Sequence, residues 1–248
     1  MWCCFEIYKS LLDVGTTTAR KTYDVYTAVP KTGAVGITDG IVANDASAAA
    51  KQKRESLFPL ERVRLDIKLQ LAESSVESDR KSILNDICEQ DAEAEPPMQH
   101  AKYDMMNGML AGRFAAGILR VVIARGKPLR PCLNALQQSR LSTLILDLSN
   151  LIKFTDKELK LLTAALPSEV EELTINLEKS KASEEGVAAL VKHVVKFPKL
   201  RRFHSDSFTP KHAKLLQSAK LLQNVPEAAF PEAASIVKDL EALATSWE

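Results

Sequence analysis

The chain has 248 residues, enough to bury one substantial core, or one core plus an extended arm. Its 33 Lys and Arg residues nearly balance 32 Asp and Glu residues, so no global field favours nucleic acid or an anionic membrane. Four cysteines without a C-x-x-C spacing favour a reducing compartment over a disulfide framework. No uninterrupted apolar run approaches about 18 residues, so we expect no transmembrane span, although peripheral membrane contact stays open.

The N-terminal segment 1–57 differs from the rest of the chain. Trp2, Phe5 and Tyr8 place aromatic bulk on one side of a predicted short helix, and such a face needs a partner. The stretch 29–44 is rich in Gly, Pro, Thr and Val without a helical period, which predicts an extended arm. The stretch 46–56 then favours a helix with basic side chains at its C-terminal end, as the helix dipole prefers.

A first strand–helix unit is predicted directly after this region. The apolar residues at 60, 63, 65 and 67 have the spacing of the later leucine phrases, so we expect a strand over 60–67. Ser74 and Glu77 offer a capping box for a helix that buries Ile83, Leu84 and Ile87. The acidic stretch from Glu89 to Pro97 then predicts a solvated loop at the start of an insertion.

The segment 89–116 is interpreted as an insertion that separates the first unit from the others. The run from Ile118 to Ile123 is apolar apart from Arg120, which predicts a strand covered on both faces. A shorter helix is expected from about Leu129 to Gln138.

Two clear copies of one leucine phrase follow. Leu141, Leu144, Leu146 and Leu148 recur at one constant spacing as Val170, Leu173, Ile175 and Leu177. A capping box is predicted after the first copy, and an N-cap serine and a buried helical stripe are predicted after the second. The residues are Thr155 and Glu158 for the first helix, and Ser183 for the second. The spacing is that of a strand–turn–helix unit stacked on its neighbour.

A third copy opens with Leu200 and Phe203. Thr209 followed by Pro210 is typical of an N-cap and the first helical position. Further on, the stretch from Phe230 to Trp247 predicts a helix that caps the last repeat.

The phrase from Leu141 to Leu146 resembles the L-x-x-L-x-L motif of leucine-rich-repeat proteins, in the long-repeat, ribonuclease-inhibitor-like class that backs each strand with a full helix. The resemblance covers roughly residues 60–223. The family's asparagine after the strand would fall at Ser149, Glu178 and Phe208, so its side-chain ladder is absent or degenerate. The resemblance implies a role like that of relatives which serve in mitochondrial membrane complexes.

We therefore predict an α/β fold: a short leucine-rich-repeat-like solenoid of about five strand–helix units with a parallel sheet. It would occupy residues 58–223, with the insertion at 89–116. Residues 1–57 would form an N-terminal amphipathic helix and extended arm, and residues 224–248 a C-terminal capping helix.

The expected function is non-enzymatic: a protein–protein interaction or scaffold protein, as an accessory structural subunit of a larger organellar or mitochondrial membrane complex. On a stacked strand array, side chains outside the core form a continuous grid suited to a large partner. We expect this sheet face and the N-terminal arm to bind other protein subunits, and we expect no nucleic acid, catalytic residue, cofactor or metal. The expected compartment is intracellular and reducing, either the mitochondrion or the cytoplasm. The candidate partner-binding residues are Trp2, Phe5, Tyr8, Arg62, Arg64, Asp66, Lys68, Asp147, Thr174, Asn176, Arg202, His204 and Asp206.

Two other classes of function remain open from the sequence. Asp13 to Thr18 resembles the phosphate-binding loop of sugar kinases and other actin-fold ATPases, which would imply an ATP-using enzyme. Leu144 to Asp156 resembles the central strand and helix start of STAS domains, which would imply a regulatory switch, but Lys157 stands where their phosphorylated hydroxyl lies. Cys3 and Cys4 resemble the paired, palmitoylated cysteines of neuromodulin-like proteins, and buried thiols are the simpler interpretation.

Overall fold

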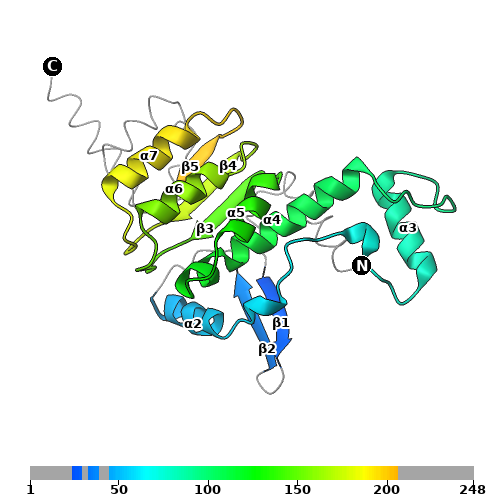
Figure 1. Ribbon diagram of the computed structural model, residues 1–248, viewed down its shortest axis with the longest axis horizontal. Helices are drawn as coiled ribbons and strands as arrows, with labels where there is room; N and C mark the ends of the chain where they lie inside the picture. Colours follow the sequence, from blue (N-terminus) through cyan, green and yellow to red (C-terminus); the bar gives the residue numbers. More distant parts are fainter. Residues whose placement is uncertain (1–23, 30–32, 39–44, 206–248) are drawn as a thin grey trace. The chain divides into compact units, whose positions relative to one another are not determined.

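The computed structural model describes residues 24–29, 33–38 and 45–205 (Figure 1). The elements are β1 (Asp24–Val29), β2 (Gly33–Thr38), α2 (Asp45–Ser56), η2 (Leu60–Arg62), η3 (Leu69–Leu71), α3 (Glu77–Cys88), α4 (Ala101–Ala124), α5 (Arg130–Gln138), β3 (Thr143–Asp147), α6 (Asp156–Ala165), β4 (Glu172–Asn176), α7 (Glu184–Val194) and β5 (Arg202–His204).

The chain divides into two compact units. The first contains the described residues up to Leu141, together with Ile145–Asp147 and Ala165–Pro167. The second contains Ser142–Leu144, Leu148–Ala164 and the described residues from Ser168 onward.

The sheet of the second half confirms the predicted α/β class. Strands β3, β4 and β5 lie in that order in one parallel sheet, and α6 and α7 connect consecutive strands. In the β4–β5 register, Leu173 is opposite Phe203. Figure 1 shows α6 and α7 running beside β4 and β5. The inner positions of the strands are leucine, isoleucine or phenylalanine except for Thr174, and all of them are buried, as is usual in parallel sheets.

The repeat seen in the sequence recurs in the backbone. The carbonyl oxygen of Ser142 accepts a hydrogen bond from the N–H of Glu171 (2.7 Å), and the carbonyl of Glu171 accepts one from Arg201 (2.8 Å). Asn150 and Lys179, at equivalent positions of successive repeats, both adopt left-handed backbone conformations, with φ of 57° and 55°. Equivalent turns therefore follow β3 and β4, although a left-handed lysine costs more than a left-handed asparagine.

The caps predicted for α6 and α7 are present. The N–H of Thr155 donates to Glu158 Oε2 (3.0 Å), and the N–H of Lys157 donates to Thr155 Oγ1 (3.3 Å). Burial alone would raise the pKa of Glu158, but the hydrogen bonds from Thr155, together with the Glu158 N–H and the charge of Lys157, leave that pKa below its usual value. Ser183 caps α7, because its Oγ accepts from the N–H of Gly186 (3.1 Å).

A carboxylate links the starts of α6 and α7. Asp156 Oδ1 accepts from the N–H of Ser183 and Asp156 Oδ2 accepts from its hydroxyl, both at 2.7 Å. These bonds, the hydroxyl's first, lower the pKa of Asp156. Gly186 leaves room for the carboxylate, since a Cβ there would lie 2.3 Å from Asp156 Oδ1. One acidic side chain thus serves two successive strand–helix modules.

The first unit has its own apolar core between α3, α4 and η3. Tyr103, Met106 and Leu110 are fully buried along one side of α4, and they pack with Leu84 of α3 and Leu69 of η3. The helix predicted from the spacing of Ile83, Leu84 and Ile87 is therefore confirmed as α3. It begins at Glu77 after Val76, so the predicted capping box from Ser74 is replaced by a single weak contact of 3.5 Å between the N–H of Val76 and Ser74 Oγ.

Two of the predicted strands are wrong. The segment 60–67 is the short helix η2 followed by irregular chain, and the strand expected at Ile118–Ile123 is the C-terminal part of α4. The predicted insertion at 89–116 therefore contains most of the core helix α4. Within 29–44, the extended arm is in part the strand β2, paired antiparallel with β1. In place of the five units predicted, the described part of the chain contains two complete strand–helix units, β3–α6 and β4–α7, followed by a third strand, β5.

Helix α4 crosses α5 at very close range. A Cβ added to Gly112 would lie 2.2 Å from the Cβ of Ser139, and one added to Gly108 would lie 3.1 Å from the carbonyl oxygen of Gln138. The two glycines, one turn apart, therefore let the end of α5 contact the backbone of α4. By length and composition, α4 qualifies as a candidate membrane span, but 78% of its apolar window is buried against the protein itself. Such burial is expected of a core helix.

The helices predicted over 46–56 and 129–138 are confirmed as α2 and α5. The predictions for the N-terminal helix, the Asp13–Thr18 loop, Cys3, Cys4, Thr209 and the C-terminal capping helix fall outside the described residues.

Candidate protein-interaction surface

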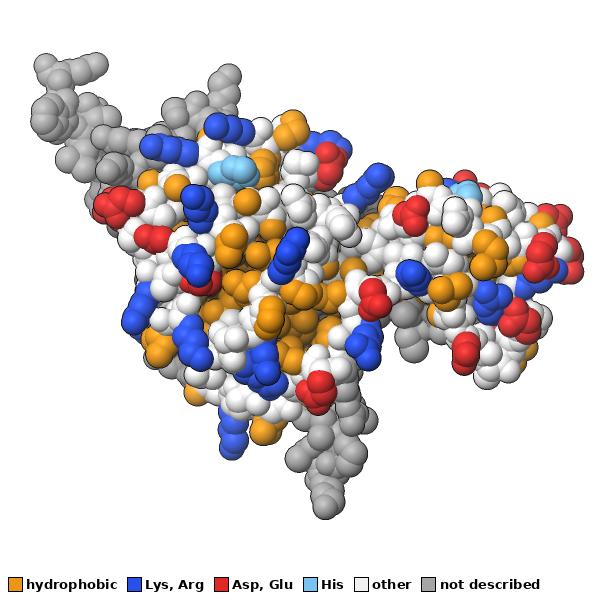
Figure 2. All heavy atoms as spheres, in the orientation of Figure 1, with side chains coloured by type: hydrophobic (Ala, Val, Ile, Leu, Met, Phe, Trp, Pro, Cys, Tyr) orange, Lys and Arg blue, Asp and Glu red, His pale blue; other side chains and the backbone are white. Residues whose placement is uncertain are grey.

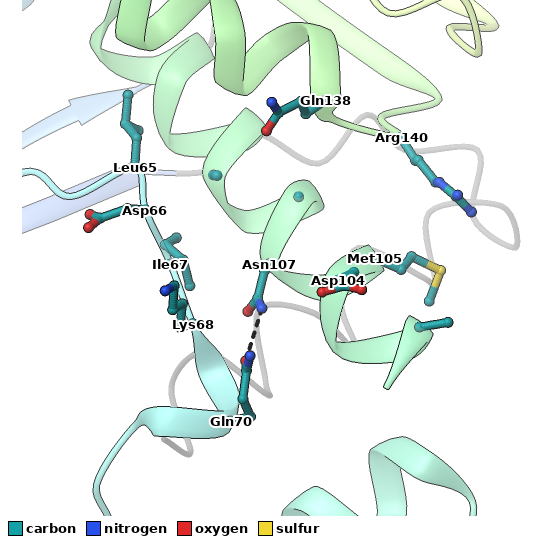
Figure 3. A pocket seen from close by; sticks show the side chains of 13 residues that line it. Leu65, Asp66, Ile67, Lys68, Gln70, Asp104, Met105, Asn107, Gln138 and Arg140 are labelled. Carbon is teal, nitrogen blue, oxygen red and sulfur yellow. Dashed lines mark hydrogen bonds between the residues drawn. The ribbon is translucent and has the colours of Figure 1, made fainter. Parts of the chain in front are cut away.

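An open cleft of about 550 Å³ lies in the first unit, beside the N-terminal half of α4 (Figure 3). One wall is the irregular chain from Leu65 to Gln70, the other is α4 from Ala101 to Ala111, and Gln138 and Arg140 border it. We call it the α4 cleft.

The two walls are fastened together by amide side chains. Asn107 of α4 donates through Nδ2 to Gln70 Oε1 (3.1 Å), and its Oδ1 accepts from the N–H of Leu69 (2.8 Å). Arg80 of α3 secures the same wall, because its Nη2 donates to the carbonyl oxygen of Gln70 (2.8 Å). The cleft is consequently preformed, with backbone and side chains held on both sides.

The lining combines apolar and charged groups. Ile67 and Met105 are half-buried and pack against the core of the first unit, whereas Asp66, Lys68 and Asp104 are exposed. Among the described residues no group of three or more His, Cys, Asp or Glu side chains is placed to hold a metal ion. Apolar side chains flanked by charges of both signs suit a polypeptide with its own mixture of charges.

The charge on this unit is unevenly spread. Figure 2 shows acidic side chains gathered at the end formed by α3 and the loop that follows it. The loop carries Asp91, Glu93 and Glu95, all exposed. It is held by the buried Asn85, whose Nδ2 donates to the carbonyl oxygens of Ala92 (3.1 Å) and Ala94 (2.7 Å). The predicted solvated acidic loop is thus confirmed at 89–97, although it is anchored to α3.

Two of the predicted partner-binding residues lie together in the first unit. Asp66 and Lys68 line the α4 cleft, and Arg64 is exposed just before them. Burial alternates along this segment, with Val63, Leu65 and Ile67 half-buried, as the spacing of the apolar residues predicted. The segment pairs with no strand in the described part of the chain, so it is not a rung of a sheet. Arg62 ends η2.

Three residues that the sequence predicts on the exposed face of the sheet are instead buried. Thr174 and Asn176 are buried at 4% and 7% exposure, and the Asp147 side chain is 7% exposed. Asn176 Oδ1 accepts from the N–H of Glu178 (2.9 Å), so this amide supports the turn after β4 instead of facing a partner. The alternation rule failed because the sheet is covered on both faces.

The edge strand β5 carries two further candidate contact residues. Arg202 is exposed and pairs with Glu172 of β4, and His204 is half-buried. The remaining candidates, Trp2, Phe5, Tyr8 and Asp206, lie outside the described residues.

A buried ion pair was not foreseen. Arg120 of α4 donates from Nε to Glu55 Oε2 (3.0 Å), and its Nη1 lies 3.7 Å from Asp147 Oδ1. All three side chains are at most 10% exposed. The available signal was one arginine in an otherwise apolar run, because a buried guanidinium requires carboxylate or carbonyl partners.

Cysteine and histidine chemistry finds no support in the described residues. Cys132 is 2% exposed, and burial raises the pKa of its thiol to about 11, so it is un-ionised at neutral pH. His193 is exposed and its ring packs edge-on against Phe197.

No family model, curated protein or solved structure matches this chain.

Proposed function

We propose that this chain is a non-enzymatic protein-interaction protein, acting as an accessory structural subunit of a larger assembly. The α4 cleft is the observation that carries the proposal. It is open and preformed, and Asp66 and Lys68 present charges of opposite sign beside the apolar Ile67 and Met105. Such a lining supports recognition of another polypeptide more than chemistry on a small substrate.

The repeated module supports the finer proposal of a short leucine-rich-repeat-like stack. β4 and β5 receive equivalent backbone bonds from the preceding repeat, and Asp156 joins two successive helix starts. Surface ion pairs also link consecutive repeats, between Glu169 and Lys199 and between Glu172 and Arg202. Repeats that contact their sequence neighbours in this way are typical of solenoid proteins, whose extended surfaces bind other molecules. A mitochondrial or cytoplasmic site of action is proposed with it.

The test reverses the charges of the cleft without changing the net charge. Affinity-tagged full-length chain is compared with the double variant Asp66→Lys/Lys68→Glu by quantitative mass spectrometry of co-purified proteins. The matched control is Glu184→Lys/Lys192→Glu, at two exposed positions of α7. We expect a co-purifying protein that the cleft variant loses and the control retains, with unchanged far-ultraviolet circular dichroism.

Two further variants probe the remaining predicted contacts: charge reversal at Arg64 and Arg202, and removal of the N-terminal segment 1–28. The proposal fails if the cleft variant and these two all leave the co-purified proteins unchanged.

A further inference from the structure

Ser56, the last residue of α2, has sequence neighbours that suit a protein kinase. Lys53 and Arg54 stand three and two positions before it, and Leu57, which follows it, is 58% exposed. Kinases choose their acceptors by charge patterns of this kind. The Ser56 side chain is exposed, and its hydroxyl donates to the carbonyl oxygen of Lys53 (2.7 Å). The acceptor oxygen is therefore at the surface, at a helix end where the chain opens most easily.

A receptor for a phosphate stands beside it. Arg125, the residue that ends α4, donates through Nη2 to the carbonyl oxygen of Ser56 (2.8 Å) and to that of Glu55 (3.2 Å). A guanidinium bonded to the carbonyl of a serine lies within reach of a phosphate on the same side chain. Planar arginine forks bind phosphate oxygens with charge-assisted hydrogen bonds.

We propose that Ser56 is a phosphorylation site for a kinase that selects basic residues before the acceptor, and that Arg125 receives the phosphate. The γ-phosphoryl group of ATP moves to Ser56 Oγ, the bond to the departing ADP breaks, and the hydroxyl proton passes to the kinase. Nothing in this inference depends on the proposed binding function.

The modification changes how α2 is held. Phosphorylation removes the hydrogen that Ser56 donates to Lys53, and it places negative charge at a helix C-terminus, where the dipole disfavours it. Arg125 offsets both effects if it turns from the two carbonyl oxygens to the phosphate. The bonds that now tie the end of α2 to the end of α4 are then exchanged for a phosphate–guanidinium pair.

The first experiment incubates the full chain with the catalytic subunit of cAMP-dependent protein kinase, ATP and Mg²⁺, and locates phosphate by peptide mass spectrometry. We expect phosphate at Ser56, no phosphate on that peptide in Ser56→Ala, and a rate about tenfold lower or less in Arg54→Gln. Ser82, exposed on α3 after Arg80 and Lys81, is the internal comparison and should react more slowly. A synthetic peptide spanning 50–62 that is phosphorylated while the intact chain is not would overturn the proposal.

The second experiment tests the receptor. Thermal unfolding is compared before and after phosphorylation in wild type, Arg125→Gln and Lys127→Gln, the last being an exposed neighbour with the same charge. Phosphorylation should lower Tm in Arg125→Gln by several degrees more than in wild type or Lys127→Gln. Equal shifts in all three proteins would refute the role of Arg125. Should unmodified Arg125→Gln fold poorly, Arg125→Lys, which keeps the charge but loses the fork, takes its place.

Discussion

Replacing Arg120 by methionine should destabilise the first unit far more than removing a surface cation. The guanidinium lies close to two buried carboxylates, at 3.0 Å from Glu55 and 3.7 Å from Asp147. Methionine fills similar space with apolar atoms but leaves these carboxylates without that positive charge. Breaking a buried pair by removing one partner costs about 3–5 kcal/mol.

The comparison is Lys199→Met, whose ion pair with Glu169 joins side chains that are 56% and 46% exposed. Solvent and salt screen such a pair, so its loss should cost about 1 kcal/mol or less. The assay is urea unfolding followed by circular dichroism. With a urea m-value of about 3 kcal/mol/M, the Arg120→Met midpoint should fall by about 1 M or more.

A double variant identifies the cause as uncompensated charge. Adding Glu55→Gln to Arg120→Met should recover part of the lost stability, because one of the two buried charges is removed. A midpoint for Arg120→Met within error of that for Lys199→Met would refute the reasoning.

Three further outcomes are expected. In the same urea titration, Gly112→Ala should lower the free energy of unfolding by about 1–3 kcal/mol, because the added Cβ clashes with Ser139. Gly108→Ala should leave the free energy of unfolding nearly unchanged, because the higher helix propensity of alanine offsets a milder contact with the Gln138 carbonyl oxygen. Because the pKa of Asp156 is lower in the folded protein than the 3.8 of the unfolded chain, the ionised carboxylate stabilises the fold above pH 3.8. This contribution is lost as the pH falls through the folded-state pKa. Between pH 5 and pH 3, Tm should therefore fall less steeply in Asp156→Asn than in wild type. At pH 8, Cys132 should resist iodoacetamide in the native protein and react in urea, and rapid native labelling seen by mass spectrometry would contradict its burial.

Part of the α4 cleft was visible in the sequence and part was not. The alternation from Val63 to Lys68 correctly separated half-buried from exposed side chains, so Asp66 and Lys68 were recognised as accessible. The sequence does not predict the opposite wall, because the pattern of segment 89–116 indicates an insertion and not the helix α4, most of which lies in this segment. A cleft between segments that are distant in the sequence depends on packing, and no local pattern predicts it.

Local sequence signals are sufficient to predict the strand–helix repeats from Thr143 to His204, together with the helix caps at Thr155 and Ser183. These elements depend on local signals: alternating apolar residues, capping side chains within one turn, and a constant spacing between the leucine phrases. Tertiary structure decided the rest. A short apolar run such as Ile118–Ile123 is compatible with a buried strand and with a buried helix. Here it is helical because it continues α4, which begins at Ala101 and places Tyr103 and Met106 in the core. Burial of a polar side chain is likewise settled by what packs over it.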